Sequence, residues 1–150
     1  MKKITPFLWF DTQAEEAMNH YVSIFKDAKV LNVHRANGKV LTVSFELMGQ
    51  QFTGLNGGPH FKFTEAISLL VNCDTQQEVD EFWEKLSQGG EKGRCGWLKD
   101  KFGLSWQIIP TALGRLMSDP NPQKSKAVFD AMMKMDKIDV AGLQRAYDQN

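Results

Sequence analysis

One stretch of the chain, GWLKDKFGLSWQIIP at residues 96–110, gathers side chains that could contact a small molecule. It holds two tryptophans, a Lys-Asp-Lys run and the amide of Gln107, which stands between Trp106 and Ile108. Because neighbouring side chains of a strand point to opposite faces, we expect Gln107 and Trp106 on opposite sides of a sheet. Aromatic area with a few amides or hydroxyls suits a small-molecule pocket. The stretch is therefore one wall of a binding site, or a core strand that carries one amide.

Histidines and cysteines are too scattered to predict a metal centre or a nucleophilic triad. His20 falls in a predicted helix, His34 in a predicted strand and His60 in a loop. The cysteines, Cys73 and Cys95, form no Cys-x-x-Cys pair. No His-x-x-x-His pair and no Ser-His-Asp order points to catalysis either.

Length, composition and charge exclude several classes of protein. A chain of 150 residues, 42% hydrophobic and 24% charged, is long enough for one domain with its own core. Eighteen basic and eighteen acidic residues balance, so the footprint of a nucleic-acid-binding protein is absent. No apolar run approaches the ~18–20 residues of a membrane helix, and MKKITPF lacks the apolar core of a signal peptide. With two cysteines read as free thiols, we expect a cytoplasmic location.

The first half of the chain predicts a strand, a helix and three strands. These segments are residues 4–10, 11–25, 30–35, 39–47 and 51–56. Asp11 or Thr12 is the expected cap of the helix, because either side chain accepts hydrogen bonds from its free N–H groups. Asn37-Gly38 predicts a hairpin, since both residues tolerate positive φ.

The second half repeats this order. A strand at 66–73, a helix at 74–90 capped by Asp74 or Thr75, and strands at 95–100 and 104–109 follow one another, with a loop at 90–94. Asp-Thr-Gln occurs at 11–13 and at 74–76, both times where a strand meets a helix. The chain therefore predicts a duplicated βαβββ unit.

The residues after Pro110 differ from this repeat. Residues 111–122 are interrupted by prolines, and two short helices are expected at 123–135 and 138–149. An apolar stripe runs along these helices; its members are Val128, Met132, Met135, Ile138, Leu143 and Tyr147. The stripe packs on its own domain or against a partner subunit.

Four blocks carry a resemblance to a known family: ITPFLWFD, NGGPHFKF, CGWLKDKFGLSWQIIP and KIDVAGLQRAYD. With paired βαβββ modules and a D-x-x-G turn from Asp100 to Gly103, the chain resembles the PhnB-like branch of the vicinal oxygen chelate superfamily. Relatives include glyoxalase I, bleomycin-resistance proteins and extradiol dioxygenases. The resemblance implies one α+β domain over 1–150, with module 1 at about 1–58, module 2 at about 64–112 and a helical tail at about 113–150. It also implies a cavity and a homodimer.

The resemblance places four candidate metal-binding positions near Thr5, Thr53, Ser68 and Gln107. Three are hydroxyls, which are poor ligands for Mn, Fe, Ni or Zn, so we expect no cofactor and no glyoxalase-type metal centre. Gln107 and His60 are the weak candidates for a metal ligand. The residues expected to line a ligand pocket are Thr5, Phe7, Trp9, Thr53, Asn56, Ser68, Trp97 and Gln107.

This branch often carries the name 3-demethylubiquinone-9 3-methyltransferase. Common S-adenosylmethionine enzymes place a glycine-rich turn after a parallel strand, where it opens a helix. Here the glycine-rich segment 54–59 lies between two β-rich units and opens no helix, so we interpret it as a linker. Asn56 is its one candidate for ligand contact.

Three functions remain open from the sequence. The first is a metal-free protein that binds or sequesters a small apolar or aromatic molecule. The second is a metal-dependent lyase, isomerase or dioxygenase that uses Gln107, His60 and a further ligand. The third is a dimeric interaction protein whose cavity is filled. A cavity and its metal content would distinguish them.

Overall fold

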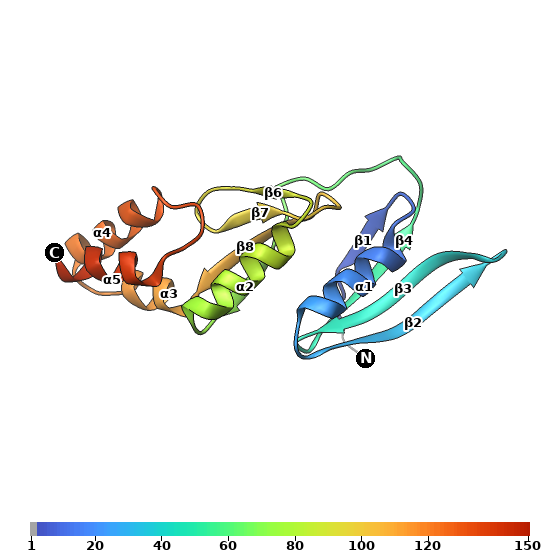
Figure 1. The fold of residues 1–150 in the computed structure, drawn as a ribbon, viewed down its shortest axis with the longest axis horizontal. Coiled ribbons are helices and arrows are strands. Elements are labelled where there is room, and N and C mark those ends of the chain that lie inside the picture. Colours follow the sequence, from blue (N-terminus) through green and yellow to red (C-terminus); the bar gives the residue numbers. More distant parts are fainter. Residues whose placement is uncertain (1–2) are drawn as a thin grey trace. The chain divides into compact units, whose positions relative to one another are not determined.

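The computed structural model describes residues 3–150, which form two compact units divided between Phe63 and Thr64. Each unit contains one four-stranded sheet and a helix that follows the sheet's first strand (Figure 1). Three more helices follow in the second unit. The predicted α+β class, with paired βαβββ modules and a helical tail, is confirmed.

The first unit consists of β1 (Phe7–Phe10), α1 (Ala14–Ile24), β2 (Ala28–Ala36), β3 (Lys39–Leu47) and β4 (Gln50–Asn56). Its strand order is β1-β4-β3-β2, with β1 parallel to β4 and the other pairs antiparallel. Asn37 has φ 54° and Gly38 φ 78°, so the predicted hairpin turn is confirmed. Buried side chains alternate along the strands and meet α1; they are Leu8, Phe10, Val43, Phe45 and Phe52.

The cap of α1 differs from the prediction, because neither Asp11 nor Thr12 supplies it. The Oδ1 atom of Asn56 accepts a 2.8 Å hydrogen bond from Ala14 N, and its Nδ2 donates to Val40 O at 3.1 Å. The parallel register that places Asn56 opposite Phe10 brings this amide to the start of the helix. The acceptor therefore comes from a distant strand.

The glycine-rich segment after β4 packs against Trp9. The indole Nε1 donates to Gly58 O at 2.9 Å, and the ring meets Phe61 edge-on with centroids 4.9 Å apart. A Cβ atom on Gly57 would lie 2.3 Å from the indole ring. The segment thus makes room for a large aromatic side chain, since only glycine permits so close an approach.

The second unit repeats the arrangement. It contains β5 (Leu69–Cys73), α2 (Gln76–Ser87), β6 (Glu91–Lys92), β7 (Trp97–Lys99) and β8 (Ser105–Pro110), in the order β5-β8-β7-β6. Thr75 caps α2 as predicted, its Oγ1 accepting from Glu78 N at 3.2 Å. The two-residue strand β6 lies where the sequence predicted only a loop, because pairing with β7 is its sole strand signal.

A buried carboxylate organises the turn between β7 and β8. Asp100 is 2% exposed, and its Oδ1 accepts from Phe102 N at 2.9 Å and from Leu104 N at 3.0 Å. Its Oδ2 accepts from the indole Nε1 of Trp106 at 2.9 Å. Asp100 therefore holds this turn through its side chain. The carboxylate also directs Trp106 toward α2.

The C-terminal residues form α3 (Thr111–Met117), α4 (Pro122–Met132) and α5 (Val140–Asp148). The prediction missed α3: Pro120 and Pro122 lie beyond its last turn, and TALGRLM contains no proline to break it. The predicted apolar stripe packs inside this unit. The hydrophobic core formed by the C-terminal residues consists of Leu113, Leu116, Val128, Ile138 and Leu143.

Gln76 ties this tail to α2. Its Nε2 donates to Ile138 O at 3.0 Å, while its Oε1 accepts from Val140 N at 2.7 Å. The tail is therefore an integral part of the second unit rather than an appendage.

Replacing Asp100 with Asn should lower the free energy of unfolding by about 2 kcal/mol, because the charged acceptor of three buried N–H groups is lost. Urea denaturation followed by circular dichroism measures this loss. Asp130→Asn is the matched control; it breaks only an exposed pair with Lys126 and should cost less than about 1 kcal/mol. Equal effects of the two substitutions would contradict the role given to Asp100.

Gly57→Ala should destabilise the protein by about 1–3 kcal/mol, because the new methyl group overlaps the ring of Trp9. Gly114→Ala is the matched control: nothing lies within 4 Å of its added Cβ, and alanine favours the helix by up to about 1 kcal/mol. Thermal denaturation of both variants measures the difference. A Gly57→Ala protein as stable as the parent would show that Trp9 is free to move.

Candidate functional site

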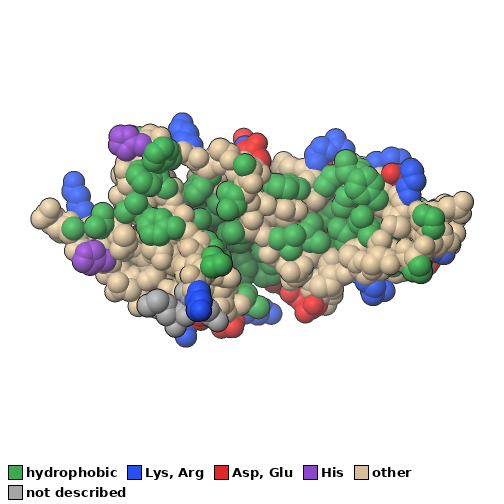
Figure 2. Space-filling model, turned by 180° about the vertical axis from the view of Figure 1, so that it is seen from behind, with side chains coloured by type: hydrophobic (Ala, Val, Ile, Leu, Met, Phe, Trp, Pro, Cys, Tyr) green, Lys and Arg blue, Asp and Glu red, His purple; other side chains and the backbone are tan. Residues whose placement is uncertain are grey.

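The sheet of the second unit has one face under α2 and one open face. In the register, Gln107 lies between Leu70 of β5 and Trp97 of β7, and Ser105 lies opposite Lys99. Trp106 is 2% exposed and lies on the face toward α2. The predicted placement of Gln107 and Trp106 on opposite sides of the sheet is therefore confirmed. Hydrophobic side chains are exposed on both units (Figure 2).

Two of the predicted site residues meet on this open face. The Nε2 atom of Gln107 donates to the Oγ of Ser68 at 3.0 Å. This bond fixes the orientation of a half-buried amide in the middle of the sheet. It leaves Oε1 of Gln107 as the amide atom that we expect a ligand to reach.

A pocket of about 460 Å³ lies at one end of the open face. Its floor is formed by Leu70, Trp97, Gln107 and Ile109, and the tail contributes Met132 and Met133 among others. Trp97 and Gln107 were predicted to line a pocket, whereas Leu70, Ile109, Met132 and Met133 were not. The apolar stripe was the available signal for Met132, but nothing in the sequence placed it beside β8.

Hydrogen bonds hold the tail against this pocket. Cys95 N donates to Met135 O at 2.9 Å, and Gly96 N donates to Asp136 O at 2.8 Å. The Arg94 guanidinium donates to Met133 O at 3.0 Å. These contacts position methionine side chains, which adapt their shape readily to a bound molecule.

The remaining predicted residues lie in the first unit. Phe7 and Trp9 lie on the face of the sheet away from α1, where Phe7 pairs with Thr53 and Trp9 with Leu55. Phe7 is 60% exposed. Thr5 is half-buried just before β1. Asn56 holds the start of α1 with its amide, and ligand contact by Asn56 stays a prediction.

The side chains at the predicted metal positions do not fit a transition-metal site. Ser68 and Gln107 hydrogen-bond to each other, and Thr5 and Thr53 offer only hydroxyls. Such donors suit Mn, Fe, Ni or Zn poorly. Within residues 3–150, no three His, Cys, Asp or Glu side chains lie close enough to share an ion. His60 is exposed in the loop after β4.

Cys73 is buried and chemically quiet. Burial raises the pKa of its thiol to about 12, and the nearby carboxylates of Glu78 and Asp74 add to this rise. Because the thiolate is the reactive form, Cys73 stays protonated at neutral pH and is a poor nucleophile.

In the part of the chain that the structure describes, no helix has the length and apolar character needed to cross a membrane.

A family model and solved structures of other proteins match most of this chain. The family model for 3-demethylubiquinone-9 3-methyltransferase matches residues 2–109. A PhnB protein from Bacillus cereus is 36% identical, with a TM-score of 0.70 over 73% of this chain and 100% of its own. Protein PA1353 from Pseudomonas aeruginosa is 17% identical, with a TM-score of 0.61 over 73% of this chain and 98% of its own. No curated protein matches the chain.

The matched region ends just before the helical tail, so α3–α5 lie outside the part that the family model describes. Both sheets, except Pro110 at the end of β8, and the helices α1 and α2 lie within it. The chain therefore belongs to the 3-demethylubiquinone-9 3-methyltransferase family, the PhnB-like branch of the vicinal oxygen chelate superfamily.

Proposed function

We propose that this protein binds a small, largely apolar molecule on the open face of its second unit, without the help of a metal ion. The observation that carries this proposal is the amide of Gln107, oriented by Ser68 and flanked by Trp97 and Leu70. Apolar and aromatic walls supply affinity, and a single oriented amide supplies direction. Binding or sequestering a molecule needs no further group.

The tail gives this proposal a specific form. Met132 and Met133 border the pocket from a segment beyond the family match. Relatives that end with β8 would present the same strand without these side chains. The tail therefore makes the pocket of this protein more apolar and narrows the range of molecules that it accepts.

The alternative function is a metal-dependent lyase, isomerase or dioxygenase. Family membership favours it, since such enzymes occur among the relatives of this branch. The donor groups at Thr5, Thr53, Ser68 and Gln107 disfavour it, because three hydroxyls and one amide make a weak ligand set. A methyltransferase activity, as in the family's name, has no support from the segment 54–59, which packs around Trp9.

The proposal also includes ligand contact on the first unit, a homodimer and a cytoplasmic location. Phe7, Trp9 and Thr53 form an aromatic and hydroxyl surface on the first unit and stay candidates for ligand contact, as does Thr5. The homodimer and the cytoplasmic location stay predictions from the family resemblance and the composition.

Gln107→Ala should weaken binding of indole, a neutral aromatic probe, about 3–10-fold, because a hydrogen bond from the probe to Oε1 is lost. The free energy of unfolding should change by less than about 1.5 kcal/mol, since only the bond to Ser68 disappears. Titration monitored by the indole N–H signals of the tryptophans in ¹⁵N-edited NMR spectra measures affinity and location together.

Gln123→Ala is the matched control, an exposed glutamine of α4 outside this pocket, and should leave indole affinity unchanged. If Gln107→Ala unfolds the protein while binding persists, Gln107 is a structural residue. If indole leaves the Trp97 signal unmoved, the proposed pocket is wrong.

A further inference from the structure

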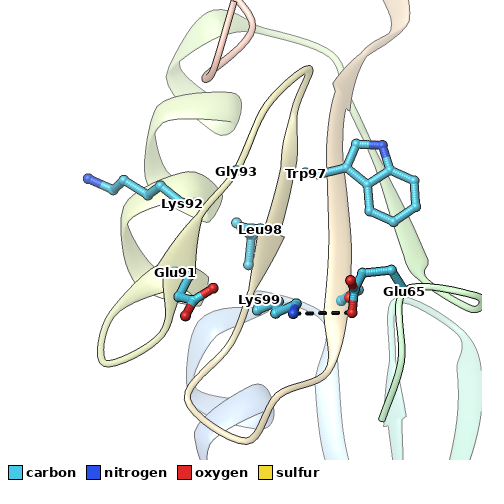
Figure 3. Close-up of a pocket in the computed structure, with 8 residues that line it drawn as sticks. Glu65, Glu91, Lys92, Gly93, Trp97, Leu98 and Lys99 are labelled. Atoms are coloured by element: carbon cyan, nitrogen blue, oxygen red, sulfur yellow. Dashed lines mark ion pairs between the residues drawn. The ribbon is translucent and has the colours of Figure 1, made fainter.

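A second pocket adjoins Trp97 in the same unit, and charged side chains border it. It measures about 150 Å³, and its side chains include Glu65, Glu91, Trp97 and Lys99 (Figure 3). Ser105 also lines it. A protein cavity of this size can hold a benzene-sized molecule. Trp97 also lines the pocket beside Gln107, so the two pockets share this indole.

Ser105 carries an unmet hydrogen-bonding group into this pocket. Its side chain is 1% exposed, and its Oγ has no partner among the described residues. Buried hydroxyls without a partner are uncommon, because each loses its bonds to water and gains nothing in exchange. Ser105 lies opposite Lys99 in the register of β7 and β8, so hydroxyl and lysine belong to neighbouring positions of one face.

Lys99 forms an ion pair with a carboxylate that another anion can displace. Its Nζ lies 3.1 Å from Oε1 of Glu65, and the two side chains point toward each other in Figure 3. Glu65 sits in the turn before β5 with 64% of its side chain exposed, whereas Lys99 belongs to a strand. An ion pair this exposed contributes little to stability, so another carboxylate can take the place of Glu65.

The other lysine of this pocket is engaged elsewhere. Lys92 extends away from Trp97 in Figure 3, and its Nζ lies 2.9 Å from Oε1 of Glu84. Lys99 is therefore the cation best placed to meet a ligand beside Ser105 and Trp97.

We propose that this pocket takes the carboxylate of a small aromatic acid. The carboxylate replaces Glu65 at Lys99 and accepts a hydrogen bond from the hydroxyl of Ser105, and the ring lies against Trp97. This inference rests on the proposed function and names its ligand class, an acid whose apolar part extends toward Gln107. Glu65 acts as a stand-in for the ligand's charge when the pocket is empty.

Titration with benzoate tests the inference, with benzamide as the uncharged probe of the same shape. In ¹⁵N-edited NMR spectra of the full chain, benzoate should shift the signals of Lys99, Ser105 and Trp97, and benzamide should bind at least about tenfold more weakly. Lys99→Met should weaken benzoate binding about tenfold or more, and Ser105→Ala about fivefold. Glu65→Gln should tighten it several-fold, because a competing carboxylate is removed.

Lys126→Met is the matched control, since Lys126 is also exposed and paired with a carboxylate, Asp130, but lies on α4. It should leave benzoate affinity unchanged. Equal affinity for benzoate and benzamide, or equal effects of Lys99→Met and Lys126→Met, would overturn the inference. If indole binds at Trp97 while benzoate does not, the acid is excluded and the proposed function stands. If neither probe binds, both fail.

Discussion

The carboxylate of Asp100 is the constraint on which the candidate site depends. By accepting hydrogen bonds from two backbone N–H groups and from the indole of Trp106, it closes the turn between β7 and β8 and fixes the register of both strands. With Trp106 directed toward α2, alternation along β8 leaves Gln107 on the open face. A slip of one residue would bury the amide and expose the indole. One buried acid thus decides which side chains lie on the open face.

The two units use one topology for different surfaces. Each has one parallel pair at an edge of its sheet, β1 with β4 or β5 with β8, and a helix over one face. In the first unit the open face carries the aromatic rings of Phe7 and Trp9. In the second it carries an oriented amide, an ion pair and the methionines of the tail. The two units therefore share a core pattern, while their open faces differ in chemistry.

Local patterns predicted most of the fold, and long-range contacts account for what they missed. Alternating polarity placed Gln107 and Trp106 correctly, and Asn37-Gly38 and Thr75 act locally as expected. The predicted cap of α1 was wrong because the actual acceptor, Asn56, lies 42 residues beyond Ala14 in the sequence. The contribution of the tail to the apolar pocket and the pairing of Glu65 with Lys99 also join segments far apart in sequence. Local periodicity in the sequence does not predict contacts between such distant segments.

Binding through an amide, hydroxyls and an indole, without a metal ion, is the central claim. Elemental mass spectrometry tests it most directly, on untagged protein as purified and after incubation with Mn, Fe, Co, Ni and Zn followed by gel filtration. The donor set at Thr5, Thr53, Ser68 and Gln107 predicts no ion retained above the buffer background. About one tightly held ion per chain would contradict the account and favour the metal-dependent enzyme, with Gln107 and His60 as the first residues to test as ligands.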